Sequence, residues 1–442
     1  MIKKHILIFA LFAAVYFIFL SERFQTVLWD ESVYLGMGKY IYSGGRVGLW
    51  ESIRPPLLPL LLGFMWALGL PYIISAKIII LAFTLGAAYL VFLITKRLVN
   101  EKTAVVAMCI LLISPIFFES SLRVMTEIPG VFFALCGVYF FIENRYYLAG
   151  IFAGLAFLTK YWHGLLFVAF LLLSWKKPKE TVKILIPGTA TIAVLLLWNL
   201  GVNNAAFAPL VLAFSHQYNP AHVIKDPLAN ILYYPYVIIL SGLVIAFAVL
   251  GFKRRLLTIV VVSAVYLVYL TYVPNKQPRF AVLILPYFCI LAASGIAKAE
   301  KMAGKYRWIA LATAALLATP MVYVDAKNML SFPANKPEIV SDYYEFFKEG
   351  DIVLSTEPVH VAYTDIHLIP FYNNITEASA GYDMHKDSVK FIVWNPTALP
   401  CYNNLSGTCE SEKASLFERM NSENNLIFNK TYFGEEKYIF AR

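Results

Sequence analysis

The stretch Trp29 to Pro59, WDESVYLGMGKYIYSGGRVGLWESIRPPLLP, contains the charged residues around which we expect the fold to be organised. The apolar run Leu7 to Leu20 precedes it and can enter a bilayer, so the acidic pair Asp30-Glu31 would emerge at the far membrane face. Arg54 is followed by two prolines, which stiffen the backbone that carries this cation. An acidic pair and a fixed cation at one interface suit a reaction on a lipid-borne phosphate.

The composition is that of an integral membrane protein. Of 442 residues, 59% are hydrophobic and only 15% are charged, against roughly 25% charged in an average soluble domain. The net charge of +9 is unevenly distributed, because acidic residues outnumber basic ones after Val340. Basic loops beside anionic lipid explain this balance, and no nucleic-acid-binding module is recognisable.

Hydropathy and charge together predict a polytopic α-helical topology. The first residues resemble a signal peptide, but no small-residue cleavage site precedes Trp29, so we expect a retained first helix with a cytoplasmic N-terminus. Leu57 to Leu70 ends at Pro71 without a basic cluster, so we expect an interfacial helix or the lead-in to the next span. About eleven apolar runs are expected to span the membrane, with every strong Lys/Arg cluster on the cytoplasmic side: Leu7–Leu20, Tyr72–Ile94, Ala104–Phe118, Ile128–Ile142, Leu148–Leu158, Gly164–Trp175, Lys183–Trp198, Leu232–Phe252, Leu256–Tyr272, Phe280–Ile296 and Trp308–Val324.

The acidic tail is expected to form a separate domain. Residues 1–325 would be the transmembrane domain and residues 326–442 a small extracytoplasmic α/β domain. Alternating and amphipathic patterns predict its strands and helices: strands at Ile352–Thr356, Val389–Trp394 and Lys437–Phe440, and helices at Ser341–Glu349 and Ser411–Met420. Cys401 and Cys409 can close a disulfide in an oxidising exterior. Three glycosylation sequons, at Asn374, Asn404 and Asn429, agree with an outside location.

This topology gathers eight charged side chains on the outer face. They are Asp30, Glu31, Arg54, Arg123, Glu127, Lys160, Lys276 and Arg279. Charges beside hydrocarbon are costly and tend to be kept at functional sites or in pairs. Simpler roles stay open: the acids can be solvated loop or helix N-terminal charges, and the cations can snorkel, flank a turn or cap a helix. His216 and His222 are weak candidates for a metal site, and we favour a polar loop there because their spacing matches no tight ligand pattern.

The order of these features resembles the GT-C membrane glycosyltransferases, in particular the branch of protein O-mannosyltransferases and lipid A aminoarabinose transferases. In that branch an acidic pair follows the first helix, as Asp30-Glu31 does, and a basic residue precedes Pro-Pro, as Arg54 does. Arg123-Val-Met-Thr-Glu127 resembles a third motif. The stretch from Ala149 to Lys160 and the late Lys276-Gln-Pro-Arg279-Phe are also similar. The resemblance covers residues 1 to about 325 and implies a GT-C fold.

The resemblance implies transfer of a sugar from a polyprenyl phosphate or dolichyl phosphate to a hydroxyl of a protein, lipid or glycan. Asp30 would be the general base, with Glu31 and Glu127 orienting the sugar or acceptor. Five cations would hold the departing phosphate: Arg54, Arg123, Lys160, Lys276 and Arg279. The anomeric configuration would invert.

Side-chain cations can replace a metal in such a reaction, so we expect no obligatory metal. Ile53 stands where some relatives carry a glutamate that contributes to a divalent-metal site, which places that metal in doubt here. Two other classes stay open. A transporter or flippase of a lipid-linked glycan would place ionisable groups near mid-membrane, often in paired repeats. A noncatalytic scaffold would leave the ordered acids and cations unexplained.

Overall fold

The computed structural model describes residues 2–23, 27–203, 205–216, 227–240, 244–306, 345–372, 374–399, 401, 408–432 and 435–442, with the single residues 308, 323 and 327. Contacts within the chain divide it into two compact units. The first unit comprises Met1–Glu22, Ser52–Leu57 and Lys77–Pro333, and the second comprises Arg23–Glu51, Leu58–Ala76 and Ala334–Arg442. Each unit is described by itself.

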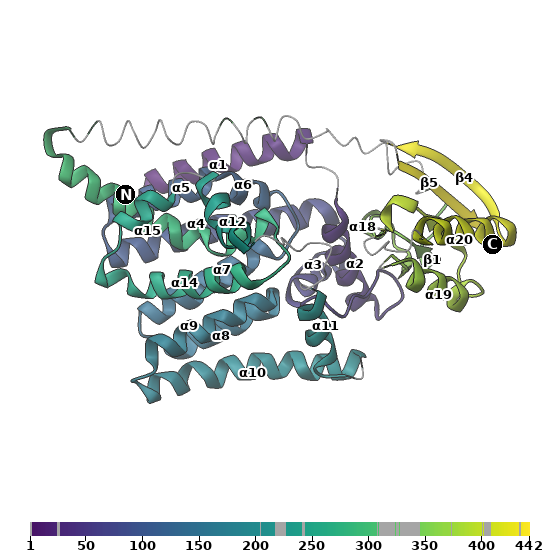
Figure 1. Cartoon of the computed structure of the whole chain (residues 1–442), viewed down its shortest axis with the longest axis horizontal. Coiled ribbons are helices and arrows are strands. Elements are labelled where there is room, and N and C mark those ends of the chain that lie inside the picture. The colour runs from purple at the N-terminus through teal and green to yellow at the C-terminus, as the bar shows by residue number, and fades with distance from the viewer. Residues whose placement is uncertain are drawn as a thin grey trace. The chain divides into compact units, whose positions relative to one another are not determined.

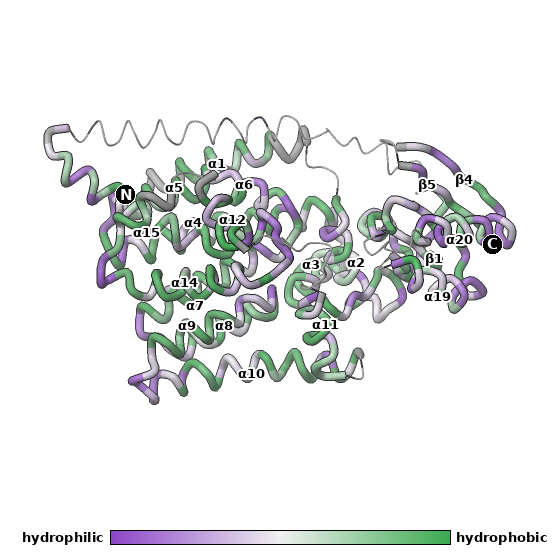
Figure 2. The backbone as a smooth tube through the Cα atoms, viewed as in Figure 1, coloured by the Kyte–Doolittle hydropathy of each residue, from purple (hydrophilic) through white to green (hydrophobic). Residues whose placement is uncertain are grey.

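The first unit is helical (Figure 1). Its α-helices, some of which extend a few residues beyond it, are α1 (Ile2–Arg23), α4 (Tyr72–Leu98), α5 (Glu101–Ile113), α6 (Pro115–Ser121), α7 (Glu127–Ile142), α8 (Tyr146–Thr159), α9 (Leu165–Ser174), α10 (Pro178–Asn203), α11 (Ala208–His216), α12 (Pro227–Leu240), α13 (Val244–Leu250), α14 (Leu257–Tyr272) and α15 (Leu285–Ala303). Short 3-10 turns are η1 (Tyr161–Gly164), η3 (Arg254–Leu256), η4 (Pro278–Leu283) and η5 (Gly304–Tyr306). Figure 2 shows long apolar stretches along these helices.

Fewer helices than expected are long enough to span a bilayer alone. Among the described residues, three helices pass by length and composition: Tyr72–Leu98, Pro178–Val202 and Arg254–Tyr272. A fourth is counted if α5 and α6, bent by 65°, form one span. The predicted run Ala104–Phe118 breaks at Ser114 because Pro115 offers no N–H to continue the helix. The predicted span Trp308–Val324 lies almost wholly outside the described residues.

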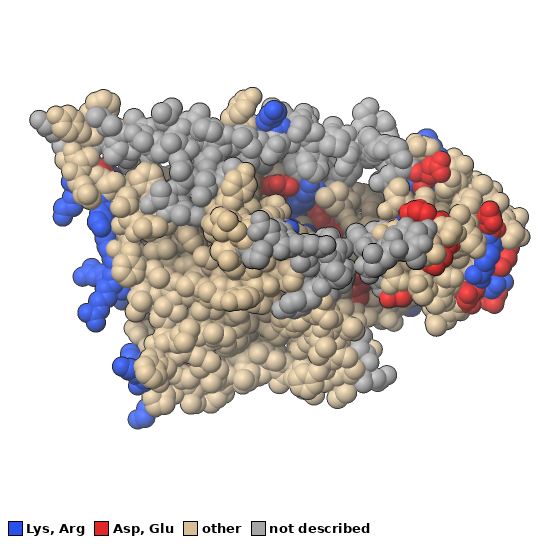
Figure 3. Space-filling model, viewed as in Figure 1, with Lys and Arg blue, Asp and Glu red and all other residues tan. Residues whose placement is uncertain are grey.

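Ion pairs bring the basic ends of several helices together. Lys96, at the end of α4, pairs with Glu101 at 3.0 Å, and Arg97 pairs with Glu143, just after α7, at 2.8 Å. Lys102 of α5 reaches Glu300 of α15 at 2.7 Å. Figure 3 shows Lys and Arg side chains gathered at one end of the helical unit. The described basic loops of this unit therefore collect at one end of its helices, as the charge pattern predicts.

Helices α8 and α10 approach closely through glycine. A Cβ on Gly150 would lie 2.1 Å from the carbonyl oxygen of Ile184, and a Cβ on Gly154 would lie 1.7 Å from the hydroxyl of Thr191. Small residues allow such backbone approach between apolar helices, where van der Waals contact replaces the hydrophobic effect. Gly150 and Gly154, in the stretch Ala149 to Lys160, are thus required for the close packing of α8 against α10.

The second unit combines helices α2 (Trp29–Ser43) and α3 (Leu57–Ala67, from Leu58) with a C-terminal sheet. The strands are β1 (Ile352–Ser355), β2 (His367–Pro370), β3 (Phe391–Trp394), β4 (Asn425–Tyr432) and β5 (Glu435–Ala441), in the order β2-β1-β3-β5-β4. β1 runs parallel to β2 and β3, whereas β5 runs antiparallel to β3 and β4. The helices of the tail are α18 (His360–Tyr363), α19 (Ile375–His385) and α20 (Thr408–Glu423), and η6 (Pro396–Ala398) is a 3-10 turn (Figure 1).

The two faces of the sheet are covered by different parts of the chain. Residues such as Leu354 and Trp394 face a core that includes Tyr382 of α19 and Met420 of α20. Alternate strand residues, including Val353 and Val393, face a second core, to which α2 contributes Val33 and Met37. This alternation follows from the two-residue period of a strand. The helix that carries the acidic pair therefore covers one face of the C-terminal sheet.

The predicted α/β tail is confirmed in outline. The three predicted strands correspond to β1, β3 and β5, and Ser411–Met420 lies in α20. β2, β4 and α19 were not predicted. The predicted helix Ser341–Glu349 is wrong in its described part, because residues 345–349 form turns in which the Asp351 carboxylate accepts the Lys348 N–H at 2.8 Å. The boundary at residue 325 stays a prediction.

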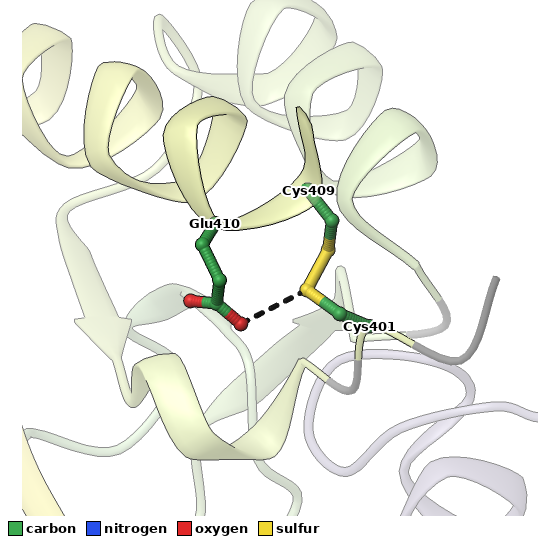
Figure 4. Close-up of side chains that lie close together, drawn as sticks. All are labelled: Cys401, Cys409 and Glu410. Carbon is green, nitrogen blue, oxygen red and sulfur yellow. Dashed lines mark hydrogen bonds between the residues drawn. A yellow bond between two sulfur atoms is a disulfide. The ribbon is translucent and has the colours of Figure 1, made fainter. Parts of the chain in front are cut away.

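Cys401 and Cys409 form a disulfide at the start of α20 (Figure 4). The Glu410 carboxylate lies 3.1 Å from the Cys401 sulfur. Among the described residues these three form the one group of His, Cys, Asp or Glu side chains close enough to share a metal ion. Because both sulfurs are bonded to each other, neither is available as a thiolate ligand.

The close approach of α8 and α10 gives a stability prediction. Gly150→Ala should lower the free energy of unfolding by about 1 to 3 kcal/mol, because its methyl group would collide with backbone. Thermal unfolding in lipid nanodiscs measures it. Gly201→Ala is the matched control, since its Cβ would meet nothing within 4 Å and alanine favours the helix. Equal melting temperatures for the two variants would contradict the close packing.

Candidate active site

Glu127 is a buried acid of the first unit. It lies in the first turn of α7, where the positive end of the helix dipole favours a carboxylate. The apolar sequence that follows buries that face of α7, and Glu127 is 2% exposed. A buried carboxylate needs partners, because desolvation otherwise costs several kcal/mol.

Two of the predicted cations, Lys160 and Arg279, are the partners of the Glu127 carboxylate. The Lys160 ammonium lies 2.8 Å from Oε1 of Glu127, and Nε of Arg279 lies 3.8 Å from the same oxygen. Lys160 ends α8 in extended conformation, and Arg279 belongs to η4. Three segments far apart in sequence therefore meet at one carboxylate, with two cations facing one acid.

Aromatic rings hold Lys160 in place. Its ammonium lies 4.9 Å from the ring centre of Trp162 and 5.0 Å from that of Phe280. The Trp162 and Phe280 rings pack edge to face, with 4.3 Å between their centres. Trp162 and Phe280 thus form part of the wall around Lys160.

His163 fixes the turn that follows Lys160. It is fully buried, and its Nδ1 lies 2.6 Å from the Tyr266 hydroxyl. A Cβ on Gly130, one turn after Glu127, would lie 2.6 Å from Nε2 of His163. Gly130 therefore lets the histidine pack directly against α7, which sets the distance between Lys160 and Glu127. The sequence did not identify this contact.

The segment between α6 and α7 holds Arg123, which is 6% exposed. Lys77 of α4 donates a hydrogen bond from Nζ to the Leu122 carbonyl at 2.7 Å, and Nη1 of Arg279 lies 3.4 Å from the Met125 sulfur. Lys77 is 1% exposed and was not among the predicted site residues. A single lysine inside the apolar run Tyr72–Ile94 was the available signal, because intramembrane charges are rarely without a role.

The remaining predicted cations occupy other settings. The Lys276 ammonium donates to the carbonyl oxygens of Leu270 and Thr271 at the end of α14, so it caps that helix. Burial lowers the pKa of Lys276 to about 8. Arg54 is half-buried in the turn before α3, beside the buried Pro55 and Pro56. The side chain of His216, like all of His222, lies outside the described residues.

Asp30 and Glu31 belong to the second unit, in the first turn of α2. Asp30 is half-buried, whereas Glu31 is fully buried and accepts the Leu28 N–H through Oε2 at 2.8 Å. This bond is one half of a capping box, so Glu31 stabilises the start of its own helix. The structure thus brings Glu127, Lys160 and Arg279 together, and the convergence of Asp30 with them stays a prediction.

Comparison with solved structures identifies the fold. ArnT from Cupriavidus metallidurans bound to undecaprenyl phosphate matches 99% of this chain and 97% of its own, with a TM-score of 0.67 and 14% identity. The chain has the GT-C fold. The archaeal oligosaccharyltransferase AglB from Archaeoglobus fulgidus, in complex with an inhibitory peptide and a dolichol-phosphate, matches with a TM-score of 0.54 and 14% identity, covering 98% of this chain and 74% of its own.

A family model matches a shorter part of the sequence. The model of the dolichyl-phosphate-mannose-protein mannosyltransferase family matches residues 53–199. That range contains Arg54, Arg123, Glu127 and Lys160. Curated protein sequences give no significant match. The resemblance stated from the motifs is thereby confirmed.

The ion pair between Lys160 and Glu127 is buried, so breaking it should lower the free energy of unfolding strongly. Lys160→Met should lower the free energy of unfolding by about 3 kcal/mol, because removing one partner of a buried pair leaves the other uncompensated. Adding Glu127→Gln to Lys160→Met should recover part of this loss, giving a double-mutant coupling above about 1 kcal/mol in nanodisc unfolding. The surface pair Lys102–Glu300, whose lysine side chain is 75% exposed, is the control and should couple by less than about 1 kcal/mol. Equal coupling in the two pairs would contradict the assignment.

Proposed function

We propose that this chain is a membrane glycosyltransferase that moves a sugar from a polyprenyl-phosphate donor to a hydroxyl acceptor on the extracytoplasmic face. The observation that carries the proposal is the buried Glu127 carboxylate between Lys160 and Arg279. Lys160 and Glu127 both lie in the range that matches the mannosyltransferase family model. The two structural neighbours, which hold undecaprenyl phosphate and a dolichol-phosphate, support a lipid phosphate as the donor's carrier.

The charge balance around Glu127 suits binding of an anion. Lys160 and Arg279 face one carboxylate, and Arg123 is buried in the segment that leads to it. A guanidinium can bind phosphate through two parallel hydrogen bonds. The proposal assigns the departing phosphate to Arg123 and Arg279, with Arg54 on its stiffened turn as a third ligand. Lys276 has a helix-capping role in addition.

Glu127 would orient the sugar. Its Oε1 accepts from Lys160, whereas Oε2 is buried and has no hydrogen-bond partner among the described residues. An unmet buried acceptor costs free energy, and a sugar hydroxyl is a suitable donor for it. Oε2 of Glu127 would thus accept a hydrogen bond from a hydroxyl of the bound sugar.

Asp30 would remove the proton of the acceptor hydroxyl. A phosphate is already a good leaving group, so deprotonating the acceptor and stabilising the leaving anion are the two tasks left to the protein. Asp30 is half-buried, and its neighbour Glu31 is occupied in capping the helix. Attack from the side opposite the phosphate would invert the anomeric carbon.

The assignment of the face rests on the two ends of α7. Glu127 begins this helix of 16 residues, and Glu143, which pairs with Arg97 of the basic end, directly follows it. At a rise of about 1.5 Å per residue the two acids lie about 24 Å apart, which is most of the roughly 30 Å thickness of a hydrocarbon core. The Glu127 cluster would therefore lie opposite the basic, cytoplasmic end.

A transporter of a lipid-linked glycan is the second candidate. Lys77, fully enclosed within the apolar α4, is the observation that favours it, because transporters place ionisable groups inside their spans. A transporter would move the labelled lipid between leaflets and leave the bond between sugar and phosphate intact.

Transfer of label tests the two candidates. Purified protein in lipid is incubated with a panel of radiolabelled polyprenyl-phosphate sugars and a membrane extract. We expect one donor to label a product, and Asp30→Asn to lower the rate at least about a hundredfold while the protein stays folded. Asp387→Asn, at an exposed aspartate that pairs with Arg442, is the control. Full activity of Asp30→Asn would remove Asp30 from the mechanism, and translocation without transfer would favour the transporter.

Chelation tests the expectation that no metal is required. Ile53 replaces the glutamate that some relatives contribute to a metal site, and the cations around Glu127 can neutralise a phosphate themselves. We expect transfer in EDTA to stay within about twofold of the untreated rate. A loss restored by Mg²⁺ or Mn²⁺ would show that a metal takes part.

A further inference from the structure

We propose that two side chains of the C-terminal domain, Tyr363 and Asp365, are positioning residues that hold helix α2 and thereby orient Asp30 for proton removal. The inference rests on the proposed function. It assigns to the C-terminal domain a part in catalysis.

Helix α2 is docked on the tail by close contact. Its apolar residues Val33 and Met37 lie in the same core as Val353 of β1 and Val361 of α18. A Cβ on Gly36 would lie 2.6 Å from Cγ1 of Val361, so α2 and α18 meet where a larger residue could not fit. The interface is therefore tight enough to transmit a displacement of α18 to α2.

The N-terminal turn of α2 is held by Tyr363. The backbone N–H of Val27 donates to the Tyr363 hydroxyl at 2.9 Å, and the next N–H, of Leu28, donates to Glu31. The rings of Trp29 and Tyr372 meet edge to face at 4.7 Å. The residues on both sides of Asp30 are thus fixed, and Asp30 itself is half-buried.

The middle of α2 is held by Asp365. The Lys39 ammonium lies 2.9 Å from Oδ1 of Asp365 and also donates to the Thr364 carbonyl at 2.9 Å. The Trp66 indole N–H of α3 donates to the same Asp365 oxygen at 3.2 Å. Lys39 is 2% exposed, so its charge depends on these oxygens.

The segment after α2 is tied to the edge of the sheet. The Gly48 N–H donates to the Ile366 carbonyl at 2.7 Å, and the Leu368 N–H donates to the Gly48 carbonyl at 2.9 Å. Gly48 forms a parallel bridge with His367, beside β2. Its φ of +94° and a would-be Cβ contact of 2.2 Å with the Gly36 carbonyl require glycine here. Both ends of α2 are therefore anchored.

A buried polar cluster fixes the base of α18. Glu357, 4% exposed, lies 2.9 Å from the Lys437 ammonium and 3.2 Å from Nε2 of His360, the first residue of α18. The Asn395 amide group donates a hydrogen bond to Oε2 of Glu357 at 3.1 Å. Burial opposes ionisation, but the hydrogen bond of His360 and the nearby positive charge hold the pKa of Glu357 at about 2. The carboxylate is thus a permanent anchor between β1, β5 and α18.

These contacts bear on rate because proton removal depends on geometry. A general base must lie within hydrogen-bond reach of its proton, and a displacement of about 1 Å can cost a hundredfold in rate. Tyr363 and Tyr372 engage Val27 and Trp29, which precede Asp30, and Glu31 follows it in the first turn of α2. Loosening α2 would misplace Asp30 without touching the donor's phosphate ligands.

The test compares Tyr363→Phe with Tyr382→Phe in the transfer assay. Both substitutions remove one phenolic hydroxyl from the C-terminal domain, and that of Tyr382 donates to Glu423, between α19 and α20. We expect Tyr363→Phe to lower kcat about tenfold with KM for the donor unchanged within about twofold, and Tyr382→Phe to leave both constants unchanged. Hydrogen exchange should rise at residues 27–34 in Tyr363→Phe alone.

Asp365 variants test the second contact. Asp365→Asn should lower kcat in the same way, and Asp365→Glu, which keeps the charge, should recover most of it. If Asp30→Asn abolishes transfer while Tyr363→Phe and Asp365→Asn keep wild-type kcat and exchange, the positioning inference fails and the proposed function stands. If the wild-type protein transfers no sugar, the proposed function fails, and the exchange measurement still shows whether these residues hold α2.

Discussion

The burial of Glu127 between Lys160 and Arg279 is the constraint on which the helical unit depends. A carboxylate that is 2% exposed must be compensated, and its partners come from the end of α8 and from η4. Trp162, Phe280 and His163 then fix the lysine's position. Two cations that face one acid suit the proposed binding of a phosphate anion.

The second unit depends on contacts between segments from opposite ends of the chain. The acidic pair follows the first helix in sequence, yet α2 covers a face of a sheet formed by the last quarter of the chain. Its capping residue Glu31 and its anchors Tyr363 and Asp365 are more than 300 residues apart. These contacts between the tail and α2 are the basis of the proposal that the tail positions Asp30.

Local patterns predicted what depends on local sequence. Alternating hydrophobicity located β1, β3 and β5, and the order of Arg54, Arg123 and Glu127 indicated the GT-C fold. The pairing of side chains from distant segments could not be predicted from the sequence. Hydropathy reports how apolar a run is and not where a proline divides it, so Ser114 was missed as a break. Lys77 and Lys39 were overlooked because a lysine's partner oxygens, here those of Leu122 and Asp365, come from distant segments.

The most direct test of the account is an experimental structure of the protein in lipid with a polyprenyl phosphate bound. The account predicts that the phosphate lies against Arg123 and Arg279, and that Asp30 and Glu127 line one cavity large enough for a sugar. A phosphate bound elsewhere, or Asp30 and Glu127 at opposite membrane faces with no cavity joining them, would contradict it.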